Sequence, residues 1–182
     1  MEPVQEKSFV NVAVISGSIL GIITSLLFYG LMLISLNSGS TGVGGFIFGC
    51  VLCCGLTILP GLLANRLYIF DIKAPIEVGK GALIGLVAGV CFGIVLGFMN
   101  VVWGLFGVDP NQLFIDYYIS LLESFDLPET DDVIAQMQDA QEQGGSGIGS
   151  LIINTIAVGV LNVLSGLAGA SLFSRSFENN TI

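Results

Sequence analysis

Cysteines are the side chains in this sequence whose type and spacing come closest to a chemical site. Four are present, at Cys50, Cys53, Cys54 and Cys91. Cys50 and Cys54 are four residues apart, so on a helix both thiols lie on one face, and three or four thiolates can hold a soft metal ion. A free cysteine is also a small buried hydrophobe, and neither a histidine nor an acidic residue lies near these positions. We therefore predict no metal site and no cofactor.

Acid and base groups for catalysis are missing from the apolar part of the sequence. The chain has no histidine, which is the commonest general base, and nine of its 14 acidic residues fall between Gly107 and Ser150. These nine are Asp109, Asp116, Glu123, Asp126, Glu129, Asp131, Asp132, Asp139 and Glu142. They lack the alternating spacing and the glycine of an EF-hand loop, so we interpret them as a solvated, repelling surface. No residue pair resembles a nucleophile with its base, and we predict no catalytic residue and no enzyme.

The elements that carry these residues are predicted to cross a membrane. Hydrophobic residues make up 53% of the chain and charged residues only 10%. The hydrocarbon core of a bilayer is about 30 Å thick and needs roughly 20 apolar residues in a helix. Four segments meet this requirement without any Asp, Glu, Lys or Arg: residues 10–36, 43–63, 82–106 and 151–173. The sequence predicts an all-α fold, a bundle of four transmembrane helices that forms one integral membrane domain over residues 1–182.

The basic residues predict the orientation of these four spans. All five, Lys7, Arg66, Lys73, Lys80 and Arg175, fall before the first span, between the second and third, or after the fourth. Lys and Arg near span ends stay on the cytoplasmic side, so both chain ends are predicted to be cytoplasmic and residues 107–150 external. Five basic residues against a net charge of -9 exclude nucleic acid as a partner, because phosphate binding needs clustered Lys and Arg.

The external segment begins with Asp109-Pro110, in which Asp caps a helix and Pro fills its first turn. Apolar residues then recur at helical spacing, which predicts an amphipathic helix. Its apolar face includes Phe114, Tyr117, Tyr118, Leu121 and Phe125. Such a helix needs an apolar surface beneath it, so we expect a short helical cap at the membrane interface or over the span ends.

Glycines repeat at every fourth position of the third predicted span, at Gly81, Gly85, Gly89, Gly93 and Gly97. Small residues at this spacing let two helix backbones touch in lipid, so the row is typical of a glycine zipper. Gly17 with Gly21, and Gly45 with Gly49, offer similar surfaces in the first and second spans. One interpretation is that the row receives another span of the same chain. The other is an interface between chains or the lining of a pore.

Three asparagines, Asn100, Asn154 and Asn162, fall within or near the predicted hydrocarbon. Buried amides need partners, and a hydrogen bond between helices contributes about 1 kcal/mol in a membrane. We interpret the three as interhelical hydrogen-bonding residues, with the lining of a polar path as the alternative. No charged group is available in mid-membrane for a proton relay or an ion-coupled site.

The layout resembles an uncharacterised family of small bacterial four-span membrane proteins. The residues that carry the resemblance are Asp109-Pro110 after the third span and Ile76-Glu77-Val78-Gly79-Lys80-Gly81 before it. The likeness covers most of the chain. It implies location in a bacterial inner membrane and supplies no catalytic residue to transfer.

The sequence therefore favours a non-enzymatic structural or accessory subunit of a larger membrane assembly. Its partners would be the lipid bilayer together with other membrane subunits or copies of itself, since small-residue faces outnumber those that one chain needs. The alternative is a homo-oligomeric channel or small-solute pore, in which glycine-rich or Asn-bearing spans surround the path.

Overall fold

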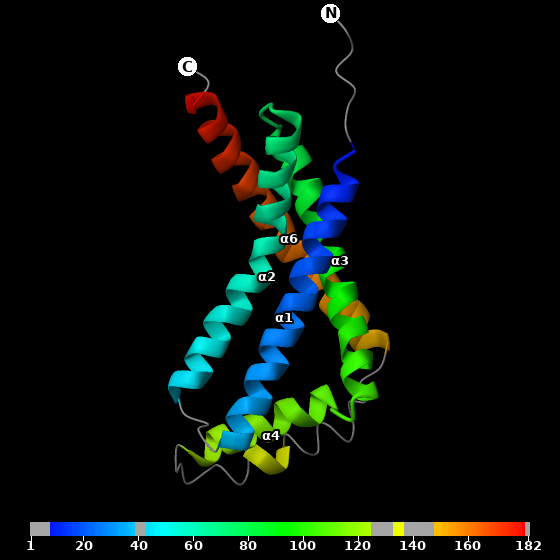
Figure 1. Ribbon diagram of the computed structural model, residues 1–182, viewed down its shortest axis with the longest axis vertical. Coiled ribbons are helices and arrows are strands. Elements are labelled where there is room, and N and C mark those ends of the chain that lie inside the picture. Colours follow the sequence, from blue (N-terminus) through cyan, green and yellow to red (C-terminus); the bar gives the residue numbers. More distant parts are fainter. Residues whose placement is uncertain (1–7, 39–42, 125–132, 137–147, 181–182) are drawn as a thin grey trace, which may run out of the picture.

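The computed structural model describes residues 8–38, 43–124, 133–136 and 148–180, and all regular elements in these ranges are helices. In chain order (Figure 1) they are α1 Val10–Ser38, α2 Val43–Ile72, α3 Val78–Leu105, α4 Pro110–Glu123 and α6 Ile148–Asn180. The predicted all-α fold is confirmed. Helices α1 and α3, and the part Leu151–Ser176 of α6, are long and apolar enough to cross a membrane. These three helices indicate that the chain is embedded in a lipid bilayer.

Helix α2 extends nine residues beyond the segment predicted from the sequence, which ended at residue 63. Pro60 lies inside the helix and does not end it. The additional turns are held by packing, because Ala64, Tyr68 and Ile69 are buried. The expected long link before α3 therefore shrinks to residues 73–77, and Lys73 ends the helix with a positive φ of 52°.

Small and polar side chains share the interior of the bundle with a few large apolar ones such as Tyr68 and Phe92, whereas the outer surface carries many large apolar side chains. Buried polar side chains include Ser16, Thr24, Ser25, Asn65, Asn162 and Ser165. Outward-facing side chains include Ile34, Phe98 and Ile153, each more than 60% exposed. Water would penalise this distribution, but hydrocarbon does not, and close backbone packing of small residues stabilises helix pairs in lipid.

The two ends of the bundle carry different elements (Figure 1). Helix α3 lies between α1 and α6 and contacts both along much of its length, while α2 crosses α6. The start of α1, the turn between α2 and α3, and the end of α6 gather at one end, which we call the termini end. Helix α4 lies across the opposite end, which we call the α4 end, and it packs against α1.

Helix α4 begins at the predicted Asp-Pro pair. The Asp109 carboxylate accepts hydrogen bonds from the backbone N–H groups of Asn111, at 2.9 Å, and Gln112, at 3.4 Å. Three buried side chains, Leu113, Tyr117 and Leu121, form the inner face of α4, and the first two pack with Met32 of α1. Of the other residues predicted for this face, Phe114 is exposed and Tyr118 half-buried, and their ring centroids are 5.7 Å apart. Phe125 lies outside the described residues.

Candidate binding cavity

The glycine row of α3 faces α6 of the same chain. A Cβ atom added to Gly85 would lie 2.9 Å from the Cα of Gly166, and one added to Gly93 would lie 2.9 Å from the Cα of Thr155. An added Cβ would also meet Gly166 and Ala170 at Gly81, Asn162 and Val158 at Gly89, and Leu151 at Gly97. At Gly81, Gly85, Gly89 and Gly93 an added Cβ would meet backbone atoms of α6, so glycine is required there for the close approach of α3 and α6. At Gly97 it would meet only the side chain of Leu151.

The other predicted glycine pairs behave differently from each other. Gly17 and Gly21 of α1 face α3, and a Cβ at Gly21 would lie 3.0 Å from the Cβ of Val95. Around Gly49 no described atom outside its own helix turn lies within 4 Å of the added Cβ, and the same holds for Gly55. Gly45 belongs to α2, but its surroundings fall outside the described part of the chain. The described part of the chain therefore provides no packing partner for the first half of α2 where Gly49 and Gly55 lie.

Asn162 connects α6 to α2 by hydrogen bonds next to Pro60 of α2. Its side chain is fully buried, its Oδ1 accepts from the N–H of Gly61 at 2.8 Å, and its Nδ2 donates to the carbonyl of Thr57 at 2.9 Å. Gly61 and Thr57 are four residues apart, which is the spacing of one helical backbone hydrogen bond. The amide of Asn162 therefore engages both polar groups of one turn of α2.

Asn65 is a second buried amide, and it was missed from the sequence because the predicted span ended two residues earlier. It is fully buried, and its Nδ2 donates to the carbonyls of Gly61, at 2.8 Å, and Gly81, at 3.1 Å. Its position one turn after Gly61, within a continued apolar stripe that includes Tyr68, could have identified it. Together, Asn65 and Asn162 close the bundle at the level where α2, α3 and α6 meet.

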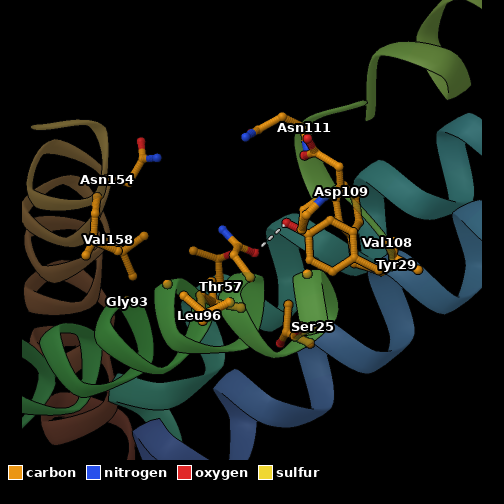
Figure 2. Close-up of a pocket in the computed structure, with 18 of the residues that line it drawn as sticks. Ser25, Tyr29, Thr57, Gly93, Leu96, Val108, Asp109, Asn111, Asn154 and Val158 are labelled. Atoms are coloured by element: carbon orange, nitrogen blue, oxygen red, sulfur yellow. Dashed lines mark hydrogen bonds between the residues drawn. The ribbon is translucent and has the colours of Figure 1, made fainter. Parts of the chain in front are cut away.

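A cavity of about 950 Å³ lies between the helices (Figure 2), on the side of Asn65 and Asn162 that faces the α4 end. Its polar lining consists of Thr24, Ser25, Tyr29, Thr57, Asn100, Asp109, Asn111 and Asn154. Its apolar lining includes Phe28, Leu96, Val101, Val108, Leu151, Ala157 and Val158. The lining comes from α1, α2, α3, α6 and the start of α4, so the space belongs to the bundle as a whole.

The cavity reaches far into the bundle. Fourteen residues separate Thr24, in its lining, from the end of α1 at Ser38, a distance of about 21 Å at 1.5 Å per residue. Thr57 of α2 is likewise fourteen residues from the start of its helix at Val43. The lining therefore extends from the residues around Asp109 to about the middle of the long helices.

The polar groups of the lining fall into paired and unpaired sets. The Tyr29 hydroxyl donates to the Oδ1 of Asn100 at 2.9 Å. Figure 2 shows the amides of Asn111 and Asn154 directed toward open space, and neither side chain has a hydrogen-bond partner among the described residues. Thr24 is only 3% exposed, and its Oγ1 is buried without a described partner. As far as the described residues show, the amides of Asn111 and Asn154 can therefore bind a guest, whereas the Thr24 hydroxyl is covered by the protein itself.

Asn100 and Asn154 therefore lie on the cavity, whereas Asn162 lies in the helix contact beneath it. From the sequence, all three asparagines are predicted to form interhelical hydrogen bonds, with the lining of a polar path as the alternative. Only Asn100 and Asn162 have hydrogen-bond partners on another helix in the described part of the chain, Tyr29 for the former and α2 for the latter.

Basic side chains of the described residues lie at one end of the bundle, together with Asp71 and Glu77. The basic residues of the described chain, Arg66, Lys73, Lys80 and Arg175, all belong to the helix ends and link at the termini end. Lys80 lies over the ring of Tyr68, with its Nζ 5.2 Å from the ring centroid. The α4 end carries Asp109, Asp116 and Glu123 and, among its described residues, no Lys or Arg. We call the part of the cavity that is lined by Asp109 and Asn111 its mouth, and this part lies at the acidic end of the molecule.

The cysteines do not contribute to this cavity in the described structure. Cys54 is exposed and Cys91 is half-buried, and the Cβ of Cys91 is 3.1 Å from a Cβ added to Gly17. The side chains of Cys50 and Cys53 fall outside what the structure describes. Within the described ranges, His, Cys, Asp and Glu side chains form no group of three that could hold a metal ion.

The chemistry that the cavity offers is hydrogen bonding from hydroxyls and amides, with one carboxylate at Asp109. Apolar and aromatic side chains complete the wall, a combination typical of binding sites for small molecules. Its function has to be argued from this geometry. No protein-family model, curated protein or solved structure matches the chain.

Proposed function

We propose that the chain is a non-enzymatic membrane protein that binds a small solute in this cavity from the non-cytoplasmic side. The observation that carries the proposal is a cavity of about 950 Å³ whose polar lining extends to the middle of the long helices. Polar groups at membrane depth are costly unless they meet protein, water or a ligand. Residues such as Asn154, without a described partner, therefore favour a site that is occupied in use.

The proposal includes a fourth span and an orientation. Helix α2 has 30 residues, and residues 43–63 carry no charge, so α2 is long and apolar enough to complete a four-helix bundle. The basic residues at the termini end favour a cytoplasmic location for that end under the positive-inside rule. Helix α4 then lies outside as a cap, in a bacterial inner membrane.

Contacts at the termini end favour binding over free conduction. The backbones of Gly81 and Gly166 meet there, and Asn65 connects α2 to α3. Because α6 occupies the glycine row, these glycines support packing within one chain better than a pore between chains. For the homo-oligomeric channel, the decisive measurement is solute flux into liposomes, and we expect none that exceeds the flux into empty liposomes.

An accessory subunit of a larger membrane assembly is a second candidate, and the first half of α2 favours it. Gly49 and Gly55 have no described neighbour, and Val51 beside them is 66% exposed. In lipid, an unpacked glycine surface suits a helix from another chain. Native mass spectrometry after gentle detergent extraction tests this candidate: a copurified partner would support it, and a monomer alone would count against it.

The solute-binding proposal is tested by asking whether water reaches the cavity from outside. In a background without the native cysteines, we expect Asn154→Cys to react with a membrane-impermeant thiol reagent added to intact cells. Ile153→Cys is the matched control. The Ile153 side chain is next to Asn154 in the sequence, is 68% exposed on the outer surface of the bundle and would face lipid. Equal protection of both cysteines would refute a hydrated, outward-facing cavity.

A further inference from the structure

We infer that the solute is a small organic cation, meaning a protonated nitrogen carried on an apolar body. This inference rests on the proposed function and adds the chemical class of the ligand. It follows from the charge around the mouth, from the hydrogen-bond acceptors in the lining, and from the mixture of apolar and aromatic wall.

The electrostatic field at the mouth favours a positive guest. Asp109 belongs to the lining, and Asp116 and Glu123 follow on the same helix. The described residues of the lining include no Lys or Arg, and the described basic residues all lie at the termini end. A cleft bordered by one sign of charge raises the local concentration of the opposite sign. An anion would meet repulsion at the same place.

Acceptors suited to N–H groups are available in the lining of the cavity. At the mouth, the Asp109 Oδ1 caps α4 through two backbone N–H groups, while the second carboxylate oxygen has no described partner. On α6, the side-chain amide of Asn154 also has no described partner, and its carbonyl oxygen can accept a hydrogen bond from a guest.

The wall indicates an organic cation rather than a metal ion. Metal ions need several carboxylate or carbonyl ligands converging at one point, and no such group of acidic side chains occurs among the described residues. Phe28 and Tyr29 supply aromatic faces, which attract cations through their π electrons. The volume of about 950 Å³ lies within the range of about 300–1,000 Å³ that is usual for sites of drug-sized molecules.

Three molecules of nearly equal size and shape separate charge from shape in the test: benzamidine is a cation, benzamide is neutral and benzoate is an anion. Binding to the full chain in nanodiscs of neutral phosphatidylcholine is measured by saturation-transfer NMR, with empty nanodiscs as the blank. We expect benzamidine to bind more tightly than benzamide, and benzoate not to bind. Phospholipid that copurifies with the chain and blocks benzamidine would instead identify the cavity as a lipid site and overturn the inference.

The carboxylate at the mouth has a matched pair of variants. Asp109→Asn removes the charge and keeps a good helix cap, because Asn caps about as well as Asp. We expect it to weaken benzamidine binding about threefold, the size of a partly exposed ion pair, and to leave benzamide unchanged. Asp116→Asn makes the same charge change outside the lining and should have a smaller effect.

The outcomes distinguish failure of the inference from failure of the proposed function. Equal binding of the three probes, or an equal effect of the two variants, would overturn the cationic class while leaving a solute site in place. If the Asn154→Cys variant is also protected from the impermeant reagent, the cavity itself is not hydrated from outside and both proposals fall. Selective benzamidine binding that Asp109→Asn weakens supports both.

Discussion

Replacement of Gly85 by alanine tests the helix contact on which the rest of the bundle depends. A Cβ at this position would lie 2.9 Å from the Cα of Gly166 and 3.0 Å from the carbonyl carbon of Asn162. The carbonyl oxygen of Asn162 would lie closer still, and ordinary contacts of a Cβ atom begin at 3.4 Å, so the two backbones must separate by about 1 Å. A gap of 0.5–1 Å forfeits about a quarter to a half of each dispersion contact that it opens.

The magnitude follows from comparison with a glycine that has free space. Gly30 lies inside α1 with no neighbouring atom within 4 Å of an added Cβ. Both substitutions gain about 1 kcal/mol of helix propensity, so this contribution cancels when the two variants are compared. The remaining difference is the cost of overpacking at Gly85, about 1–3 kcal/mol. We therefore expect Gly30→Ala to match or exceed the parent in stability and Gly85→Ala to fall below Gly30→Ala by that amount.

Unfolding in mixed micelles of a mild detergent and sodium dodecyl sulfate measures this difference. Trp103 is the single tryptophan of the chain, and its Nε1 donates to the Oγ of Ser25 at 3.0 Å, so its fluorescence reports separation of α3 from α1. Far-ultraviolet circular dichroism follows the helices. If Gly85→Ala proves as stable as Gly30→Ala, α3 and α6 do not touch through their backbones and the reasoning is refuted.

Two further substitutions test other contacts. Asn162→Leu removes a buried amide that satisfies two backbone groups of α2, and we expect a loss of about 1–3 kcal/mol in the same unfolding assay. Asn154→Leu, at a position without a described partner, should lose much less, and equal losses would contradict the assigned role of Asn162. Tyr117→Ala removes a buried ring between α4 and α1, at a cost of about 3–5 kcal/mol for a fully buried aromatic. We expect faster amide hydrogen exchange in the Tyr117→Ala variant, confined to α4. Phe114→Ala is the control, because the Phe114 side chain is 41% exposed. Unchanged exchange in Tyr117→Ala would show that Tyr117 does not hold α4 against α1.

The sequence predicted the long helices because uninterrupted apolar runs have few other solutions in a bilayer. The glycine spacing of α3 also indicated a close helix contact, but it could not identify α6 as the neighbour, since periodicity defines a face and not its partner. Charged residues such as Arg66 made the segment after residue 63 read as a link. In the structure Arg66 is exposed while Tyr68 is buried, so packing on one side of α2 overrides the charge on the other.

The cavity itself could not be predicted, because its lining comes from five helices and no short motif contains it. Thr57 and Asn154 are 97 positions apart, yet both line it. Single polar residues in apolar segments are normally interpreted as interhelical hydrogen bonds. That interpretation is right for Asn162, which has partners on α2. It does not consider that a polar residue can instead line a space between two helices that diverge.

The position of the cavity follows from where the glycines are. Helix α3 meets glycines or small residues along both neighbours, whereas α2 meets α6 mainly around Gly61 and Gly169 and, among the described residues, has no neighbour at Gly49 or Gly55. Small-residue pairs commonly cross at about 40°, so two straight helices that touch at one point are displaced sideways from each other by roughly 10 Å at a distance of about 15 Å from the contact. That sideways offset is close to the diameter of a helix. A space of this size exists because the contact at Gly61 is tight, and polar residues line it where an apolar bundle would need bulky side chains to fill it.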